Sequence, residues 1–208
     1  MPIIDPFLPV LEAWIHDIGR LDEIKAAERQ ERVNHAEASA KRAPKILAPF
    51  EKELGQEAIA ALTEAVARHS RPNADDDSDL AVFLKDADRL DGIGAIGLPR
   101  VFAFYPDRPI YKPGDPFSVG KDTSEGHLRY SGKSTQLDAL VRNMEWFADP
   151  RFGLRTETAV RLGIPRIELM IAFLYQLADE LEIHRDQVDQ LPVVQGIKEK
   201  LLLYKPSV

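Results

Sequence analysis

The chain has 208 residues, of which 44% are hydrophobic, and this is enough for one well-buried core. Its formal net charge of -7 argues against a nucleic-acid-binding protein, which needs a concentrated basic surface. No stretch approaches the roughly 20 apolar residues of a membrane span. The N-terminus also lacks the pattern of a signal peptide, so we expect a soluble, cytoplasmic protein.

The chain contains no cysteine. Disulfides, thiolate nucleophiles and zinc sites with cysteine ligands are therefore excluded. Any metal would be held by imidazole and carboxylate groups, and five histidines are present.

The first predicted helix, over residues 9–18, ends at a neighbouring histidine and aspartate. Its apolar residues recur at near-helical spacing: Leu8, Leu11, Trp14, Ile15 and Ile18. Gly19 follows and is the residue that most easily forms a left-handed C-cap. This pattern places His16 and Asp17 in the last turn.

Two further helices carry histidines. Residues 23–45 are charged and alanine-rich and predict one amphipathic helix, with a break where Pro44 and Pro49 punctuate it. His35 lies on this helix. Residues 56–69 predict the next helix, in which His69 falls on the apolar stripe and therefore faces inward.

A fourth helix is predicted over residues 80–91, after an acidic loop at 73–79 that ends in an N-cap. It carries Asp86, Asp88 and Asp91. On the helical wheel Asp91 lies nearest the middle of the apolar stripe and Asp88 lies at its margin, so phase favours Asp91 as the buried carboxylate.

The second half of the chain predicts a loop and two more helices. Three glycines loosen residues 92–97, and residues 105–126 hold four prolines without a clear period, which is typical of a functional loop. Ser134 caps a helix with Leu137, Leu140, Val141, Met144 and Phe147. The last helix carries Ile167, Met170, Ile171, Leu174, Leu177 and Leu181. No repeat, strand pattern or glycine-rich phosphate loop is present, so the sequence predicts an all-α fold.

Four segments, in this order, resemble the successive signatures of the HD-domain metal-dependent phosphohydrolase superfamily, especially its small YedJ-like hydrolases. The segments are AWIHDIGR (13–20), VNHAEASAKRA (33–43), ARHS (67–70) and KDADRLDGIGAIGLPRVF (85–102). Their order is more specific than any single motif, and the last is the strongest. The resemblance implies a single HD-type domain over residues 1–208, a helical bundle around a metal-centred cleft. Its core would span about 8–181, with the 105–126 loop near the cleft and a C-terminal extension at 182–208.

The resemblance also implies the site residues. His16 and Asp17 would be the HD metal ligands, and Asp88 would be the closing aspartate because it occupies the middle position of DADRLD. Asp17 and Asp88 would thus be the catalytic carboxylates. His35 and His69 match histidines that line the same cleft and would bind substrate phosphate or a second metal.

One departure concerns the start of the family pattern, which is a histidine on a preceding helix. The fifteen residues before His16 contain no histidine. Three explanations stay open: the true start lies upstream, another residue or water fills the position, or catalysis has been lost. The same stretch leaves the apolar face of the first helix uncovered, so we expect a homodimer or an upstream extension.

The expected reaction is hydrolysis of a nucleotide or another small phosphate ester by a metal-activated water. The donor set suits divalent Mn, Fe, Mg, Co or Ni. Glu37 or Asp91 is a candidate orienter or proton acceptor. The candidates for clamping the phosphate are Arg20, Arg71, Arg100 and Lys121.

Simpler explanations exist for the same residues. His16 would be favoured by the helix dipole beside an unrelated acid, Asp88 would form a surface ion pair, and His69 would be a core histidine. His184 is expected at the surface, and His127 either there or at the cleft. Two other functions also remain: a non-catalytic HD-derived binding or scaffold protein, and a redox HD protein with two irons and an oxygenase role.

Overall fold

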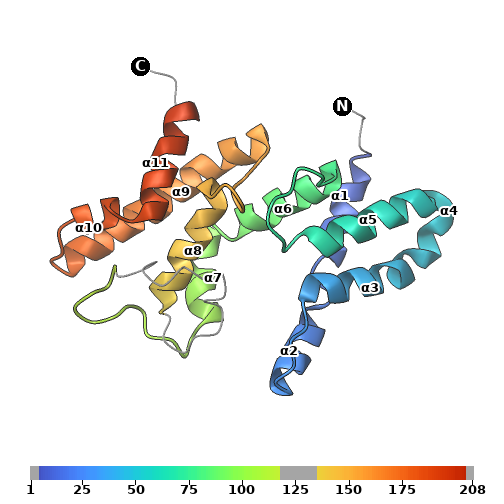
Figure 1. The fold of residues 1–208 in the computed structure, drawn as a ribbon, viewed down its shortest axis with the longest axis horizontal. Coiled ribbons are helices and arrows are strands. Elements are labelled where there is room, and N and C mark those ends of the chain that lie inside the picture. The colour runs from blue at the N-terminus through green and yellow to red at the C-terminus, as the bar shows by residue number, and fades with distance from the viewer. Residues whose placement is uncertain (1–4, 118–134, 205–208) are drawn as a thin grey trace. The chain divides into compact units, whose positions relative to one another are not determined.

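The computed structural model describes residues 5–117 and 135–204, and in these residues every regular element is a helix (Figure 1). The predicted all-α class is therefore confirmed. The chain divides into two compact units, one up to Ala87 and one from Asp88 onward. The prediction of one HD-type domain over the whole chain stays a prediction, and the two units are described separately below.

Five helices and most of a sixth form the first unit. They are α1 (Phe7–Ile15), α2 (Arg20–Glu28), α3 (His35–Leu47), α4 (Glu51–Leu54), α5 (Gln56–Arg68) and α6 (Asp79–Asp91), with a short 3-10 turn at Ala48–Phe50. In Figure 1, α3 and α5 run side by side, and α5 also packs against α1 and α4. The buried core comprises Ile15, Ala43, Leu47, Leu62, Ala65, Val66, Leu80, Ala81 and Leu84. Helix α5 therefore holds the unit together.

The first helix ends earlier than its pattern predicts. Helix α1 stops at Ile15, so His16 and Asp17 lie in the turn that follows and not in a last helical turn. The predicted left-handed cap at Gly19 is wrong, because Gly19 has a right-handed φ of -83° and precedes α2 as its N-cap. The turn thus redirects the chain from one helix into the next.

The single helix predicted over residues 23–45 is two helices. Helix α2 ends at Glu28, and Gln30 has a positive φ of 61°, which no continuing helix permits. Asn34 then starts α3, since its side chain accepts hydrogen bonds from the N–H groups of Ala36 and Glu37. Pro44 lies within α3 and does not break it.

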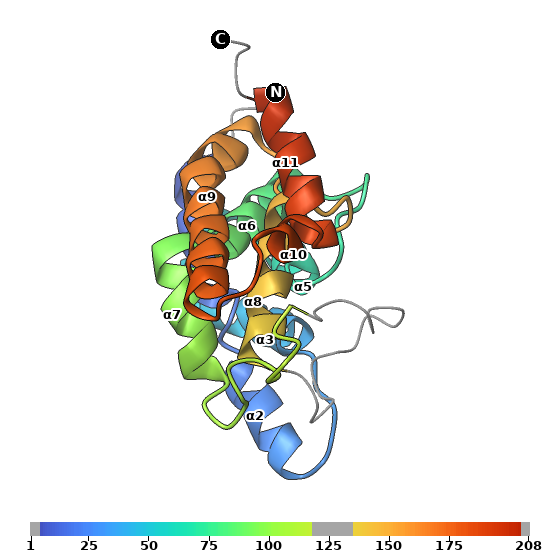
Figure 2. The same ribbon diagram turned by 90° about the vertical axis from the view of Figure 1, so that its left-hand side faces the viewer.

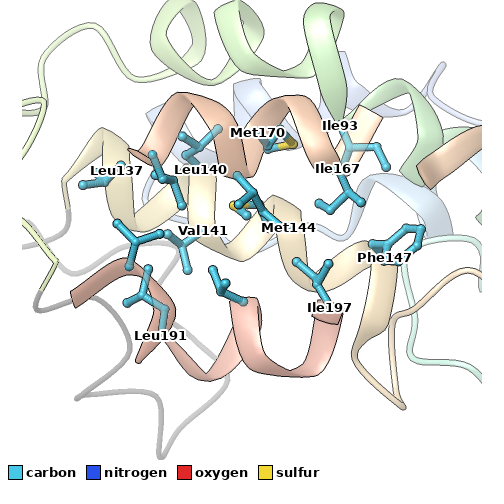
Figure 3. Packing of buried hydrophobic residues seen from close by; sticks show 14 of the residues in the cluster. Ile93, Leu137, Leu140, Val141, Met144, Phe147, Ile167, Met170, Leu191 and Ile197 are labelled. Carbon is cyan, nitrogen blue, oxygen red and sulfur yellow. The ribbon is translucent and has the colours of Figure 1, made fainter. Parts of the chain in front are cut away.

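The second unit contains the remaining helices and the larger core. They are α7 (Gly94–Phe104), α8 (Gln136–Ala148), α9 (Glu157–Glu180), α10 (Asp186–Asp189) and α11 (Pro192–Tyr204). Helix α9 packs against α7, α8 and α11, and its course beside α7 is seen in Figure 2. Figure 3 shows Met144, Met170, Ile167 and Ile197 packed together from α8, α9 and α11. The apolar stripes predicted for α8 and α9 therefore form this core.

Several details of the second unit differ from the sequence patterns. The sequence patterns do not predict helix α7, because the glycines at 92–97 indicate a loosened segment. The cap of α8 is Thr135, which forms a capping box with Asp138, and the predicted cap Ser134 lies outside the described residues. Residues of α10 and α11, including Val188 and Ile197, belong to the core. The end of the chain thus contributes to the fold.

Other predictions can be followed in the described residues. Residues 105–117 form no regular helix, as predicted, whereas 118–126 of the same loop lie outside the described residues. Helix α1 exposes Phe7, Val10 and Trp14, on the helix for which a partner was expected. A homodimer through that face stays a prediction. None of the helices in the described parts of the chain combines the length and apolar content of a membrane-crossing segment.

A glutamate is fully buried in the first unit. Glu12 on α1 is 0% exposed, and both of its carboxylate oxygens lack a hydrogen-bond partner among the described residues. Burial, together with the nearby Glu64 carboxylate, raises the pKa of Glu12 from 4.5 to about 8. Glu12 is therefore protonated in the folded protein at neutral pH and ionised in the unfolded chain.

This difference predicts how stability depends on pH. Because the folded protein retains a proton that the unfolded chain releases, the free energy of unfolding should fall as pH rises from about 4.5 to about 8, by at most about 1.4 kcal/mol per pH unit from this group. Glu12→Gln should remove this fall and be the more stable protein near pH 8. Urea titrations at several pH values test it, with the exposed Glu57→Gln as control. Parallel curves for wild type and Glu12→Gln would contradict the assignment.

Candidate metal centre

Four of the sequence-predicted side chains converge in the first unit. His16 and Asp17 come from the turn after α1, His35 is the first residue of α3, and His69 is the C-cap of α5. One ligand atom each from His16, Asp17 and His69 lies within 4.8 Å of the others. His35 joins them through Asp17 and His69. The structure thus gathers three helix ends around one carboxylate.

The atoms at the centre have the spacing of metal ligands. Nε2 of His35 and Nε2 of His69 are 3.2 Å apart, and Oδ1 of Asp17 is 3.5 Å from the first and 3.6 Å from the second. Ligand atoms that share one metal at about 2.1 Å are separated by roughly 3.0 to 3.5 Å in octahedral or tetrahedral geometry. Oδ2, the other oxygen of Asp17, is 3.7 Å from Nε2 of His16. Oδ1 of Asp17 thus faces the pair His35 and His69, and Oδ2 faces His16.

Helix ends orient two of the rings. Nδ1 of His16 lies 2.7 Å from the carbonyl oxygen of Ala13, and Nδ1 of His69 lies 2.7 Å from that of Val66. Carbonyls in the last turn of a helix lack a backbone partner, so each imidazole donates its Nδ1–H there. In the neutral ring Nε2 then carries the lone pair and points into the cluster, which is the usual arrangement of a metal-ligating histidine.

The charge state of the cluster also suits a cation. Burial raises the pKa of Asp17, but the positive charge of Arg20 and its hydrogen bond to this carboxylate act in the opposite direction, and the pKa lies well below its usual range. Burial and the charge of Arg20 lower the pKa of His35, although Glu23 opposes this. An ionised carboxylate and neutral imidazole are the forms that bind metal. Hard oxygen with imidazole nitrogen fits the divalent ions predicted from the sequence.

Gly19 fixes the turn that carries the HD pair. Its N–H donates to Oγ of Ser39 on α3 at 2.9 Å. A Cβ at this position would lie 2.6 Å from the backbone nitrogen of Ser39 and against the carbonyl oxygen of His35. Only glycine permits this approach, because any side chain at position 19 would push the turn away from the beginning of α3.

Two of the predicted phosphate-binding arginines lie in the first unit. Arg20 donates from Nε to Asp17 at 3.1 Å and from Nη1 to Glu23 at 2.9 Å, so its contacts orient site carboxylates. Arg71 is exposed and pairs with Glu37 at 3.2 Å. This pairing places Glu37 on the surface, away from a role on the central atoms.

The remaining candidates lie in the second unit or outside the described residues. Asp88 is half-buried and begins the second unit, so its role as closing ligand stays a prediction. The helical phase that favoured Asp91 as buried is wrong, because Asp91 is exposed and pairs with Arg100 of α7. Lys121 and His127 are not among the described residues. His184 is exposed beside Asp186, as predicted.

Glu23 is the site residue that the sequence patterns missed. Both of its carboxylate oxygens lie 3.4 Å from Nδ1 of His35. The prediction of one helix over 23–45 concealed this contact, since residues twelve apart on one helix cannot meet. The signal was Asn34, a cap residue directly before His35, which starts a second helix that can fold back on α2.

The solved structures that resemble the chain include the following three. A protein from Lactobacillus plantarum has 18% identity and a TM-score of 0.48, over 86% of this chain and 99% of its own. An HD-superfamily hydrolase from Bacillus thuringiensis has 16% identity and a TM-score of 0.45, over 86% of each chain. Bacillus subtilis YpgQ in complex with ADP has 18% identity and a TM-score of 0.43, over 84% of this chain and 96% of its own.

These similarities concern the fold alone. One of the three proteins is named for the HD superfamily. No family model matches the chain, and no curated protein matches it. The chemistry of the site therefore has to be argued from its own residues.

The packing of Gly19 leads to a test of the site's architecture. Gly19→Ala should push the HD turn away from α3 and lower the free energy of unfolding by roughly 1 to 3 kcal/mol. It should also weaken Mn²⁺ binding, measured by calorimetry, because His16 and Asp17 move with the turn. Gly196→Ala, whose added Cβ would meet nothing within 4 Å, is the control and should be neutral or slightly stabilising. Wild-type stability in Gly19→Ala would show that the turn tolerates displacement.

Proposed function

We propose that the protein is a metal-dependent hydrolase of phosphate esters whose centre is Asp17. The observation that carries this proposal is the triangle formed by Nε2 of His35, Nε2 of His69 and Oδ1 of Asp17, with sides of 3.2, 3.5 and 3.6 Å. Three acceptor atoms at this spacing repel one another unless a proton or a cation lies between them. A divalent metal is the occupant that matches all three.

The geometry favours the metal role of His35 and His69 over direct substrate binding. Both rings are almost fully buried, and their Nε2 atoms face Asp17. Because Oδ1 of Asp17 faces this pair and Oδ2 faces His16, we propose that Asp17 would hold metal together with all three histidines. Asp88 would be the closing ligand, as the sequence resemblance implies.

The residues of the chain would divide the work of hydrolysis. A divalent metal supplies a water of lowered pKa and polarises the phosphoryl oxygen. Asp17 and the histidines would hold the metal, and Arg20, which donates from Nε to Asp17 at 3.1 Å, keeps this carboxylate ionised and oriented. No protein nucleophile is required, in keeping with the absence of cysteine. Substrate phosphate would approach from the partly exposed side, where His16 and Asp17 lie.

The proposed substrate class is a nucleotide or another small phosphate ester. This follows from the resemblance of the motifs and rests on no contact in the structure. A panel of nucleoside mono-, di- and triphosphates and simple sugar phosphates tests it, and ADP, the ligand seen with YpgQ, belongs in that panel. Stoichiometric metal without hydrolysis of any member would favour a binding protein instead.

Asp17 provides the direct test of the metal centre. Asp17→Ala removes the one carboxylate that faces all three histidines, so metal content and hydrolysis should fall together, the rate by roughly 100-fold or more. Elemental analysis of the purified protein and a phosphate-release assay measure the two effects. Asp75→Ala, an exposed acid of the same unit, is the matched control. Full activity in a metal-free Asp17→Ala protein would contradict the proposal.

A second pair of variants tests the closing ligand. Asp88→Ala is expected to lower metal content and activity, whereas Asp91→Ala should leave both unchanged because Asp91 is exposed and paired with Arg100. The two acids lie three residues apart on α6, so they control for one another. Loss of metal in Asp91→Ala with retention in Asp88→Ala would reverse the assignment taken from the DADRLD motif.

A further inference from the structure

His35 differs from the other two histidines of the site. His16 and His69 each donate Nδ1–H to a backbone carbonyl of their own helix, which fixes the proton on Nδ1. His35 is the first residue of α3 and has no helical turn before it that could offer such a carbonyl. What faces its Nδ1 is the carboxylate of Glu23, with both oxygens at 3.4 Å.

The groups that face Nε2 of His35 favour the tautomer with the proton on Nε2, in which this nitrogen cannot bind a metal. Nε2 of His35 faces Nε2 of His69 at 3.2 Å and Oδ1 of Asp17 at 3.5 Å, and both atoms are hydrogen-bond acceptors. Without a counterweight, the neutral ring would carry its proton on Nε2 and donate it into the cluster. In that tautomer His35 has no lone pair directed at a metal.

Glu23 favours the opposite tautomer, with the proton on Nδ1. A carboxylate can only accept, so it stabilises the tautomer with the proton on Nδ1. It is held in place by Arg20, whose Nη1 donates to it at 2.9 Å while Nε of the same guanidinium donates to Asp17 at 3.1 Å. Arg20 thereby also satisfies Oδ1 of Asp17, the acceptor that competes for the His35 proton.

We propose that Glu23 is a positioning residue that biases neutral His35 toward the Nδ1–H tautomer, so that its Nε2 is available as a metal ligand. The inference rests on the proposed function, since it takes His35 as a ligand. Glu23 itself touches neither metal nor substrate. It acts on the centre through His35 and, together with Arg20, links the first turn of α2 to both Asp17 and His35.

The test compares Glu23→Gln with Asp22→Asn. The glutamine keeps the shape of the side chain and an oxygen for Arg20, but its NH₂ group can donate to Nδ1 of His35 and so favours the other tautomer. Asp22 is the preceding residue on α2 and pairs with Arg42, so Asp22→Asn makes the same change of charge outside the site. Thermal denaturation shows that each variant is folded.

Two readouts separate the inference from the proposed function. The ring ¹⁵N shifts of His35 in the metal-free protein report its tautomer, and they should move toward Nε2–H in Glu23→Gln but not in Asp22→Asn. Calorimetry with Mn²⁺ should show an affinity roughly 10- to 100-fold weaker in Glu23→Gln. Equal tautomer populations in wild type and Glu23→Gln would overturn the inference, whatever the metal does. A wild type that binds no Mn²⁺ would overturn the proposed function instead.

Discussion

The site depends on one close approach, that of the turn after α1 to the beginning of α3. Gly19 lies against the backbone of His35 and Ser39 with no room for a side chain, and its N–H is held by Ser39. This contact brings Asp17, in the turn between α1 and α2, to the ring of His35. Helix α5 packs on both α1 and α3 and adds His69. The Gly19 contact thus brings His35 to the carboxylate, and the packing of α5 on α1 brings His69 to it.

Each side chain is then aimed by the helix end on which it sits. Two histidines occupy positions where backbone carbonyls lack partners, and these carbonyls fix the tautomer of the rings. The third histidine, His35, begins a helix, and the carboxylate of Glu23 faces its Nδ1 in place of a backbone carbonyl. Arg20 pairs with both Asp17 and Glu23. One guanidinium therefore orients the carboxylate that would bind metal and the carboxylate that faces Nδ1 of His35. The site is therefore built from ordinary features of helix termini, and α2 contributes Arg20 and Glu23 but no ligand.

Much of this could be predicted from the sequence, and the failures have physical causes. The 3.6-residue period identified α5, α6, α8 and α9, because each buries a continuous apolar stripe. The same reasoning placed His69 inside. It failed at α7, where Gly92 and Gly97 are needed for close contact of the chain with itself and Gly94 has a positive φ of 79°. Glycine in a helical segment signals packing as well as flexibility, and a single sequence does not separate the two.

The site showed the same limits. Histidines and Asp17 were found from their order along the chain, whereas Glu23 could not be, because its role depends on the turn at 29–34 that folds α2 back on α3. Asp91 was misjudged because the helical wheel treats α6 as if its last turn had the same neighbours as its first. Helix α7 begins soon after α6 ends, and its Arg100 pairs with Asp91 at the surface. Phase predicts burial only while the neighbouring elements stay the same.

The electrostatics of the cluster connect its fold to its chemistry. Asp17 and Glu23 carry two negative charges against the one positive charge of Arg20, and the three imidazoles add lone pairs and no compensating charge when neutral. Such a cluster is unfavourable in a buried setting, because acceptor atoms at 3.2 to 3.6 Å repel one another. A cation would relieve this repulsion in the folded state and find no equivalent cluster in the unfolded chain. Metal binding would then stabilise the first unit, by an amount that grows with the metal concentration relative to its dissociation constant. The cluster that would hold the metal is thus also the part of the first unit whose stability would depend most on it.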